Sequence, residues 1–468
     1  MEIPQSMHLQ YLEAKRIIEE SEDIKVYSHI DCDGICSGAI LSTILDRQNK
    51  AHEIEFVNLD VLDDMTLDHE LTIFSDLGSG QRIDTNAKEG QKIIILDHHP
   101  PLRDISYRNG KPYTYLEINP MHHGIDGSYY VCGGGLCYFL AKEFGYDDLS
   151  WIGVLSAIGD MQNTKSGHFE GLNKIIQQDA IDGGYLSVFE NDINIYGRNT
   201  RPLFVALSYF SDVKLPITNN TNETMAILEE LGIDEKHNRK TLNQLTMAEK
   251  GKLYQKLNEM ISKAVPGRYV RYIPQLIIGD SYTFLKEDED SFLRDASEFS
   301  TAMNACGRNR QEKVAMEVLK GDRIEAFDQL EAVSLEHRRN LARAISSITE
   351  DENTNIIELE NLQYFDGTGI KPEIVGTVTG MILGSCNWQK PIIGFTQTDD
   401  YGLKISLRCS RLLSYDGIHF GNMIREIASE VGGTGGGHAM ACGAYIPINK
   451  KDEFIELFNN KLNNTLTN

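Results

Sequence analysis

The sequence has no cysteine pair with C-x-x-C spacing and no long apolar run. Its eight cysteines are scattered over 468 residues, which predicts reduced thiols and not a zinc site or a disulfide framework. No apolar run approaches the roughly 18 residues that span a bilayer, so we expect no membrane segment. Residues 1–20 are charged and predict an amphipathic helix instead of a signal peptide. The expected location is the cytoplasm.

The sequence also has few basic residues for its size. Lys and Arg number 45 against 69 Asp and Glu, so that the net charge is −24. This excess of acid argues against non-specific binding of duplex DNA through bulk charge. It does not exclude an enzyme that acts on nucleic acid, because divalent metals and a few local arginines can carry the phosphate contacts.

The order of the segments predicts more than one domain. Strand-like and helix-like segments alternate at first, which is typical of βαβ units with a parallel sheet. A polar, helical stretch follows, and then a second series of strand-like runs. We therefore expect an α/β fold with a first domain over 1–204, a helical insertion over 205–290, a connecting segment over 291–333 and a smaller α/β domain over 334–468.

Three strand-like runs of the first domain end in polar residues that can ligate a metal. These runs are "IKVYSHIDCDG" (24–34), "LTIFSDLGSG" (71–80) and "KIIILDHHPP" (92–101). In parallel sheets, ligands bind outside the carboxyl ends of the strands. Crowded carboxylates repel each other and raise each other's pKa unless a cation intervenes. The candidate residues at these strand ends are His29, Asp31, Asp33, Asp76, Asp97, His98 and His99.

Each of these motifs has a simpler interpretation when it is taken alone. "DHHPP" is then a polar turn, and D-x-D-G is a turn or a calcium loop. The rest of an EF-hand is missing, because Ser42 stands at position 12 counted from Asp31. A buried helix predicted over 149–160 adds Asp160 as a fourth segment. Four carboxylates and two imidazoles from four segments suit two Mn²⁺ or Mg²⁺ ions and an in-line phosphoryl displacement.

The motifs resemble those of a known family. "SHIDCDG", Asp76, "LDHHP" and "IGD", in this order, are similar to the four motifs of the DHH phosphoesterases. "GGTGGGHAMACGAYI" (432–446) is similar to the G-G-H signature of the DHH-associated domain. "EFSTAMNACGRNR" (298–310) resembles the N-A-x-G-R segment of RecJ-type exonucleases, and "YGRNTRPLFVAL" (196–207) resembles archaeal RecJ-like nucleases. The implied fold is a parallel-sheet DHH domain with a helical insertion and a smaller α/β DHH-associated domain.

The resemblance implies a role for each site residue. Two residues have catalytic roles: Asp97 would orient His98, whereas His99 would face the scissile phosphate. Asp76 would bridge two Mn²⁺ (or Mg²⁺) ions. The first ion would be held by His29, Asp31 and Asp76, and the second by Asp33, Asp76, His98 and Asp160.

The resemblance also implies substrate contacts in the later part of the chain. Arg308 has a simpler interpretation as a solvated arginine at a helix end. The glycines of 432–437 would bind a phosphate or the strand's end through backbone N–H groups, with a flexible linker as the alternative. The expected substrate-binding residues are Asn304, Arg308, Arg408, Gly436, Gly437 and His438.

The function that follows from the resemblance is a metal-dependent exonuclease on single-stranded DNA or RNA, in DNA replication or repair. One alternative is a phosphoesterase of short oligonucleotides or nucleotides. Another is a replisome scaffold with residual nuclease activity. The resemblance to archaeal proteins implies the GINS complex as a partner, with the helical stretch 205–290 either as its binding surface or as a guide for the strand. DNA or RNA preference and polarity stay open.

Overall fold

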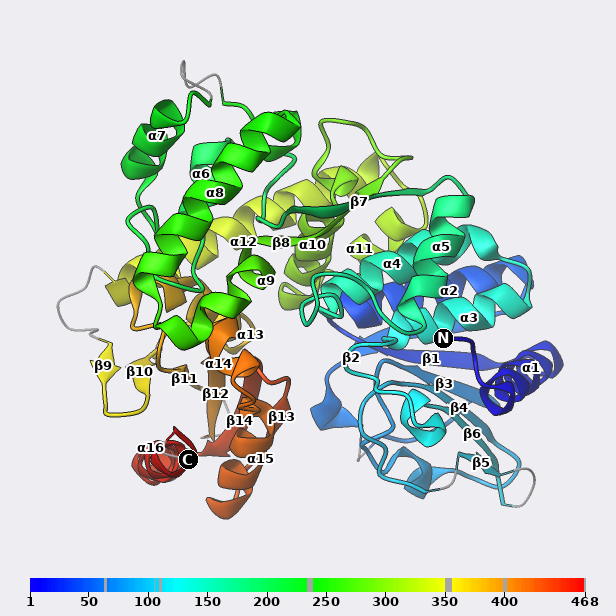
Figure 1. Ribbon diagram of the computed structural model, residues 1–468. Helices are drawn as coiled ribbons and strands as arrows, with labels where there is room; N and C mark the ends of the chain where they lie inside the picture. Colours follow the sequence, from blue (N-terminus) through cyan, green and yellow to red (C-terminus); the bar gives the residue numbers. More distant parts are fainter. Residues whose placement is uncertain are drawn as a thin grey trace. The chain divides into compact units, whose positions relative to one another are not determined.

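The structure of the chain is a computed structural model that describes residues 1–62, 65–104, 106–108, 112–233, 239–349, 356–398 and 402–466. Its contacts divide it into two units (Figure 1). Unit 1 comprises Met1–Asp192 and Gly279–Leu335, and unit 2 comprises Ile193–Ile278 and Glu336–Asn468. The chain therefore passes from unit 1 to unit 2, returns, and passes over again.

Unit 1 is built on a six-stranded sheet in the order β2-β1-β3-β4-β6-β5. Five strands are parallel, and the short edge strand β5 is antiparallel to β6. The predicted parallel sheet is confirmed. The strands are β1 (Ile24–His29), β2 (His52–Val57), β3 (Leu71–Ser75), β4 (Lys92–Leu96), β5 (Tyr107–Arg108) and β6 (Thr114–Ile118).

The register of this sheet brings three strand ends to one level. Ser28 of β1 lies opposite Ser75 of β3, and Ser75 lies opposite Leu96 of β4. The next residue along each strand is therefore delivered to the same edge. β4 itself reads Lys-Ile-Ile-Ile-Leu and is buried on both faces, as a central parallel strand should be.

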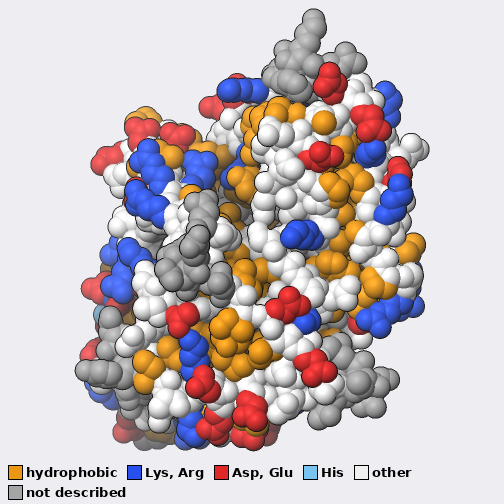
Figure 2. Space-filling model, turned by 90° about the vertical axis from the view of Figure 1, so that its left-hand side faces the viewer, with side chains coloured by type: hydrophobic (Ala, Val, Ile, Leu, Met, Phe, Trp, Pro, Cys, Tyr) orange, Lys and Arg blue, Asp and Glu red, His pale blue; other side chains and the backbone are white. Residues whose placement is uncertain are grey.

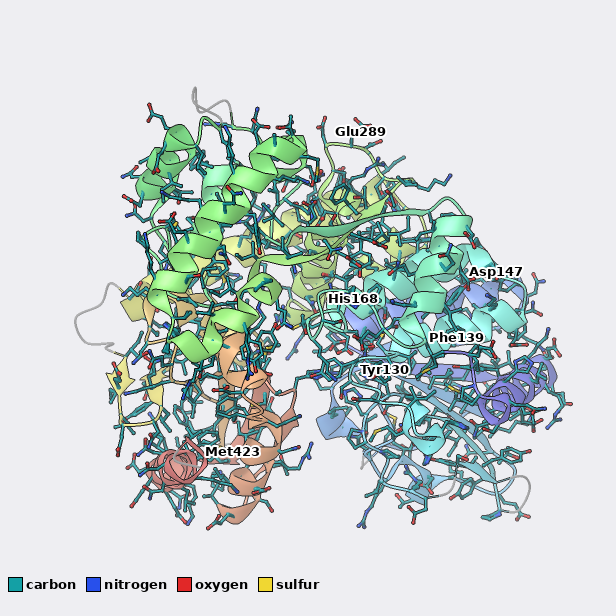
Figure 3. The ribbon with its side chains drawn as sticks, viewed as in Figure 1. Tyr130, Phe139, Asp147, His168, Glu289 and Met423 are labelled. Atoms are coloured by element: carbon teal, nitrogen blue, oxygen red, sulfur yellow. The ribbon has the colours of Figure 1, made fainter. Side chains whose placement is uncertain are left out.

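Helices cover one face of the sheet, and loops cover the other. Val26, Ile73 and Ile94 share a core with the helices, including Phe139 on α3 (Figure 3). On the opposite face, Phe74 packs with Leu62 and Ile83 from short 3₁₀ turns and loops. The helices are α1 (Gln5–Glu20), α2 (Cys32–Arg47), α3 (Gly133–Glu143), α4 (Ser150–Gly159) and α5 (Asn173–Asp182), and the 3₁₀ turns are η1 (Leu59–Val61), η2 (Ile83–Asn86), η3 (Pro120–His123) and η4 (Asp147–Leu149).

The segment after residue 278 returns to unit 1 and packs into its core. β8 (Ile278–Phe284) pairs with β7 (Leu186–Ile193) as a two-stranded sheet. Phe299 and Met303 of helix α10 (Ala296–Arg308) lie in the same core as α2 and α4. The elements here are η7 (Phe292–Arg294), α10 (Ala296–Arg308), α11 (Glu312–Leu319) and α12 (Glu325–Thr349).

Unit 2 contains a second, mixed sheet in the order β13-β14-β12-β11-β10-β9. Its core includes Met423 on α15 (Figure 3). The glycine run forms strand β13, paired antiparallel with β14, so it is not a linker. The strands are β9 (Ile357–Glu358), β10 (Gln363–Asp366), β11 (Ile392–Gln397), β12 (Gly402–Arg408), β13 (Thr434–Gly437) and β14 (Ala441–Pro447). The helices are α13 (Pro372–Ile382), η8 (Leu383–Ser385), α14 (Arg411–Tyr415), α15 (Phe420–Glu430), η9 (Ile448–Lys450) and α16 (Lys451–Leu466).

The helical region of unit 2 shares its core with the second sheet's helices. Trp388 and Leu412 pack among its apolar side chains. The Arg411 guanidinium lies 2.6 Å from Asp212 Oδ2 and donates to the Leu276 carbonyl over 2.8 Å. The region consists of α6 (Leu203–Ser208), α7 (Thr221–Glu230), η5 (Leu242–Gln244), α8 (Met247–Ala264), η6 (Gly267–Tyr272) and α9 (Ile273–Ile277).

The fold class is as predicted: a parallel-sheet α/β domain, a helical region and a smaller mixed-sheet α/β domain. The boundaries at 204, 290 and 333 remain a proposal, and the chain changes between the two units near residues 193, 279 and 336. All eight cysteines are buried, free thiols. Among the helices of the described residues, none has the length and apolar character to cross a bilayer.

Candidate metal centre

The turn from β1 into α2 carries three of the candidate ligands. His29 is the last residue of β1, Asp31 is the N-cap of α2, and Asp33 lies in the first turn of that helix. Asp31 Oδ1 accepts a hydrogen bond from the Gly34 N–H over 3.1 Å. A Cβ at Gly34 would lie 2.1 Å from the His29 carbonyl oxygen. Only glycine therefore fits this turn, which places His29, Asp31 and Asp33 close together.

Asp76 follows β3 and has an unusual backbone. Its φ is 58°, in the left-handed region that residues other than glycine seldom adopt. Its N–H donates to the Leu96 carbonyl over 2.9 Å, and its side chain is only 2% exposed. Backbone strain of this kind is found at functional sites, where the surrounding structure holds it in place. Here it directs a carboxylate into the space between β1 and β4.

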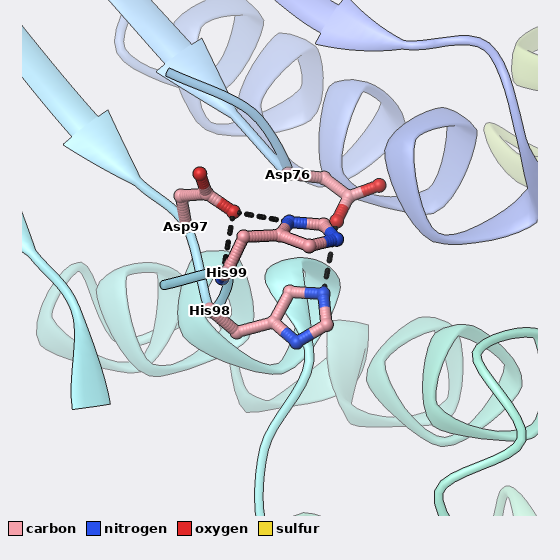
Figure 4. Close-up of side chains that lie close together, drawn as sticks. All are labelled: Asp76, Asp97, His98 and His99. Carbon is pink, nitrogen blue, oxygen red and sulfur yellow. Dashed lines mark hydrogen bonds and ion pairs between the residues drawn. The ribbon is translucent and has the colours of Figure 1, made fainter. Parts of the chain in front are cut away.

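Asp76 contributes to two groups of candidate ligand atoms. In the first group, His29 Nδ1 lies 3.1 Å from Asp31 Oδ2 and 3.4 Å from Asp76 Oδ2. In the second, His98 Nε2 lies 3.2 Å from Asp76 Oδ1 (Figure 4). The structure thus brings His29, Asp31 and His98 around Asp76, as the strand ends predicted.

The second group also includes Asp33 and Asp160. His98 Nε2 lies 3.5 Å from Asp33 Oδ2 and 3.8 Å from Asp160 Oδ2. Asp160 is the C-cap of α4, as the sequence predicted for the end of this helix. These atoms lie close enough to share one ion. All six residues predicted as metal ligands therefore lie at one edge of the sheet.

Asp33 is held by groups that the sequence analysis did not identify. Its carboxylate accepts from the Gly133 N–H over 2.8 Å and from the Gly134 N–H over 2.7 Å, at the start of α3, and also from the Ser156 hydroxyl. A Cβ at Gly133 would lie 2.7 Å from Asp76 Cβ, and one at Gly134 would lie 2.1 Å from Ser156 Oγ. The glycines that begin α3 thus allow the helix N-terminus to approach the acids, where its dipole favours negative charge.

His98 is oriented by a backbone carbonyl and not by Asp97. Its Nδ1 lies 2.8 Å from the Gly127 carbonyl oxygen, which can only accept. Nδ1 therefore carries a proton, and Nε2 is the nitrogen that faces the carboxylates and can ligate a metal. The expectation that Asp97 orients His98 was wrong.

Asp97 instead holds His99 and the backbone around it. Its Oδ1 accepts from the His99 N–H over 3.2 Å and lies 2.8 Å from His99 Nδ1 (Figure 4). Its Oδ2 accepts from the Ser79 N–H over 2.9 Å. Burial alone would raise the pKa of Asp97. The charges of His99 and His98 and these hydrogen bonds outweigh burial and hold this pKa below its ordinary value. Asp97 is thus an ionised anchor for His99, whose side chain is 44% exposed.

The residues present fit a bound divalent cation. In the part of the chain that the structure describes, three buried atoms at the centre of the site have no hydrogen-bond partner: His29 Nδ1, Asp76 Oδ1 and His98 Nε2. A bare imidazole nitrogen that faces carboxylate oxygens is repelled unless a proton or a metal lies between them. Mixed nitrogen and oxygen ligands suit Mn²⁺ and, with more oxygen, Mg²⁺. The groups His29–Asp31–Asp76 and Asp33–His98–Asp160 can therefore each hold an ion, and Asp76 Oδ1 also lies 3.2 Å from His98 Nε2.

The pKa shifts reflect the same crowding. Burial lowers the pKa of His29, but Asp31 and Asp76 outweigh it and hold this pKa well above its ordinary value. Burial likewise opposes a charged His98, but Asp160, Asp76 and Asp33 raise its pKa well above the ordinary value. Burial and then the charge of Asp76 raise the pKa of Asp33. The metal-free site therefore holds protons that a cation would displace.

Three domain families match successive parts of the chain. The N-terminal domain of the DHH family matches residues 23–157, the DHH-CID domain matches 195–273, and the DHHA1 domain matches 359–464. An uncharacterized protein of Methanocaldococcus jannaschii is 31% identical over 449 residues, which cover 94% of each chain. The chain belongs to the DHH phosphoesterase family. The metal-ligand candidates at and just after the ends of β1, β3 and β4 lie within the DHH match, and Asp160 lies just beyond it.

Two solved structures have the same fold over nearly the whole chain. CDC45 from Entamoeba histolytica has a TM-score of 0.62 at 14% identity, over 98% of this chain and 99% of that chain. RecJ from Thermus thermophilus in complex with Mn²⁺ has a TM-score of 0.56 at 13% identity, over 99% of this chain and 55% of that one. At these identities the likeness shows a RecJ-like and CDC45-like fold for this DHH protein.

Asn304 and Arg308 lie in unit 1 with the metal-ligand candidates of the DHH domain. Asn304 Oδ1 accepts from the Cys32 N–H over 3.0 Å, so this oxygen binds the protein's own backbone. The Arg308 guanidinium is half-buried, and among the described residues no carboxylate lies within salt-bridge distance of it. Burial lowers the pKa of Arg308, while the charge of Asp31 opposes this. Arg308 is therefore a cation beside the ligand groups.

The other expected substrate residues lie in the DHHA1 domain of unit 2. Arg408 ends β12 opposite Ala441 of β14, and its guanidinium donates to the Leu407 carbonyl over 2.8 Å. Gly436 and Gly437 lie in β13 and are paired on one side with β14. The His438 N–H donates to the Ala441 carbonyl over 3.0 Å. Their roles as substrate contacts remain a proposal.

The occupancy of the site should depend on pH in a defined direction. The raised pKa values of His29 and His98 imply stability that is fully present below about 6.5, the ordinary value of an unfolded histidine. This stability is lost as the pH rises through the folded values. Mn²⁺ competes with the same protons, so its apparent affinity should rise with pH, by up to about tenfold per unit for each proton displaced.

Thermal unfolding between pH 6 and 9 checks this prediction. The Tm of EDTA-treated protein should fall as the pH rises, and the increase in Tm on adding Mn²⁺ should grow. The same titration on Asp148→Asn, which removes an exposed carboxylate paired with Arg47, should give the wild-type curve. A Mn²⁺-induced shift that stays constant over this range would contradict the proton competition.

Proposed function

We propose that this chain is a two-metal phosphodiesterase that hydrolyses single-stranded DNA or RNA from one end. The observation that carries the proposal is that two ligand groups, His29–Asp31–Asp76 and Asp33–His98–Asp160, lie on either side of Asp76. The half-buried Arg308 lies near Asp31. Two Mn²⁺ or Mg²⁺ ions, when bound, would supply hydroxide near neutral pH and neutralise charge on the reacting phosphate. The phosphodiester is the class of substrate that these charges suit.

The chain's own residues would bind and protonate the substrate. Arg308 presents a planar set of N–H donors that matches phosphate oxygens. His99, whose Nδ1 is held by Asp97, has its Nε2 left for the substrate. Burial and His98 lower the pKa of His99, but Asp97 and Asp76 outweigh them and raise it. A protonated His99 could thus contact the scissile phosphate or donate a proton to the leaving oxygen.

The surface charge supports contacts through a few local groups. On the face drawn in Figure 2, Lys and Arg side chains are interspersed with Asp and Glu side chains. The net charge of −24 would repel a nucleic acid at long range. Binding would then depend on the metal ions, Arg308 and the proposed DHHA1 contacts Arg408, Gly436, Gly437 and His438. The RecJ-like fold supports a single strand as the substrate.

The test uses purified protein with Mn²⁺ on single strands of DNA and RNA that are labelled at either end. We expect mononucleotides released from one end, and no cleavage in excess EDTA or by Asp76→Asn, which also controls for contaminating nucleases. Internal cleavage would contradict exonuclease action. If the protein cleaves strands of a few nucleotides but not longer ones, the short-oligonucleotide phosphoesterase is favoured. If it cleaves no strand, the replisome scaffold is favoured.

We further propose a role in replication or repair, with the GINS complex as a partner. The support is the resemblance to archaeal RecJ-like nucleases together with the DHH-CID match over 195–273. Deleting this region would expose Trp388, Leu412 and Arg411, so a truncated chain is a poor test. A pull-down with the host's GINS subunits should instead compare the intact chain with Met247→Asp, which alters an exposed side chain of α8. No binding by the intact chain would remove this partner.

A further inference from the structure

We infer that Asn304 is a positioning residue for Asp31: it fixes the backbone that carries this carboxylate and so sets the first ligand group. The inference rests on the proposed metal site. It differs from the expectation that Asn304 contacts the substrate. The evidence lies in the contacts between the end of α10 and the turn from β1 into α2.

Asn304 completes the N-terminus of α2. The first N–H groups of a helix have no partner within the helix and need one from elsewhere. Asp31, the N-cap, accepts from the Gly34 N–H. The N–H of Cys32, the first residue of α2, donates to Asn304 Oδ1 over 3.0 Å. Because an N–H can only donate, the oxygen of this amide must face Cys32. The peptide unit after Asp31 is thus held by a side chain 272 residues away.

Gly307 braces the peptide unit before Asp31. A Cβ at Gly307 would lie 1.8 Å from the Ile30 carbonyl oxygen, so α10 packs directly against this carbonyl. Asn304 and Gly307 are three residues apart and therefore lie on the same side of α10. The same helix face consequently fixes both peptide units that flank Asp31.

The side chain of Asp31 needs this support. It is 46% exposed, so packing around the carboxylate does not hold it. Its Oδ1 is used by the Gly34 N–H, and its Oδ2 lies 3.1 Å from His29 Nδ1. A small tilt of the flanking peptides would move Oδ2 away from His29 and Asp76. Positioning partners of metal ligands typically contribute 10- to 100-fold in metal affinity or activity.

The experiment measures Mn²⁺ binding to the full chain by titration calorimetry and by the electron paramagnetic resonance of free Mn²⁺. Asn304→Ala should weaken one of two Mn²⁺ sites by about 10- to 100-fold and leave the other near the wild-type value. Asn304→Asp retains the acceptor for the Cys32 N–H and should restore this site to within a few-fold. Thr301→Ala, an exposed change on the same helix whose hydroxyl bonds the Ser297 carbonyl, should bind as wild type.

Several outcomes would overturn the inference. If Asn304→Ala binds both ions normally and only raises KM, Asn304 is a substrate contact. If Asn304→Ala loses its near-ultraviolet circular dichroism, it is misfolded and Gly307→Ala gives a second test. Gly307→Ala presses on the Ile30 carbonyl without removing the partner of the Cys32 N–H. Normal Mn²⁺ binding by a folded Gly307→Ala excludes the bracing of Asp31. Wild-type protein that binds Mn²⁺ but cleaves no phosphodiester contradicts the proposed function and not the positioning role. Wild-type protein that binds no Mn²⁺ contradicts both.

Discussion

Asp76→Asn should abolish hydrolysis and leave the protein folded. Among the described residues, the Asp76 carboxylate lies 3.4 Å from His29 Nδ1 and 3.2 Å from His98 Nε2, so it contacts both histidines of the site. Mutating a residue that only orients a metal ligand already lowers metal affinity or activity by about 10- to 100-fold. Losing Asp76, itself a ligand candidate, should therefore lower the activity by more than about 100-fold. Asparagine has nearly the same shape, and it also tolerates the left-handed backbone with φ of 58°. The change thus removes charge without adding strain.

The same variant should have a Tm close to that of the wild type when no metal is present, because two effects of Asp76 oppose each other. The charge of Asp76 raises the pKa of Asp33, which shows that the two buried acids repel each other. Removing Asp76 relieves this repulsion, but it also removes the attraction by which Asp76 raises the pKa of His29 and of His98. The measurements are Mn²⁺ titration, kcat with a labelled single strand, and the Tm in EDTA. Asp148→Asn removes an equal charge from an exposed ion pair and is the matched control. Asp76→Asn with full activity would contradict the shared-ligand assignment.

The edge of the sheet where the site lies could be predicted from the sequence. Strand-like runs of five or six residues that end in or before Asp or His indicate parallel strands, and the carboxyl ends of such strands meet at one edge. The structure brings the ends of β1, β3 and β4 to one level for this reason. Asp160 was also placed correctly, because the apolar run before it indicated a buried helix.

The partners that orient the ligands could not be predicted in the same way. His98 is held by the carbonyl of Gly127, which lies 29 residues away in a loop, and a carbonyl leaves no mark in a sequence. The adjacent Asp97 was the natural candidate, but it turns toward His99 instead. Gly133 and Gly134 are a signal that could have identified one of these contacts, because glycines at the start of a helix allow another part of the chain to approach its backbone closely.

The helical region shows another limit of sequence analysis. Its polar, helical composition favoured a separate insertion over 205–290. In the structure its apolar side chains pack with Trp388 and Leu412, and Asp212 pairs with the half-buried Arg411. Such contacts join segments about 200 residues apart, and composition alone does not reveal them. Residues 279–290 return to unit 1 because β8 pairs with β7.

Arg308→Ala should greatly reduce cleavage without weakening metal binding. The guanidinium is half-buried beside Asp31, and burial lowers its pKa. Among the described residues no carboxylate forms a salt bridge with it, so a bound phosphate is the partner that would compensate its burial. Losing a charge-assisted hydrogen bond of about 1–3 kcal/mol corresponds to a roughly 5- to 150-fold lower kcat/KM. Arg308→Lys keeps the charge but not the planar pair of donors, so its activity should lie between those of the wild type and Arg308→Ala.

Metal binding separates this role from damage to the ligand groups. Arg308 is a cation near the candidate metal ligands, so its removal should leave the Mn²⁺ affinity unchanged or increase it. The Tm in EDTA should not fall, since the guanidinium has no carboxylate partner to lose within the described residues. Lys313→Ala removes an exposed positive charge from the next helix, α11, and should cleave like the wild type. An Arg308→Ala protein that binds Mn²⁺ more weakly would instead make Arg308 a structural support of Asp31, and one with normal kcat/KM would exclude it from the phosphate site.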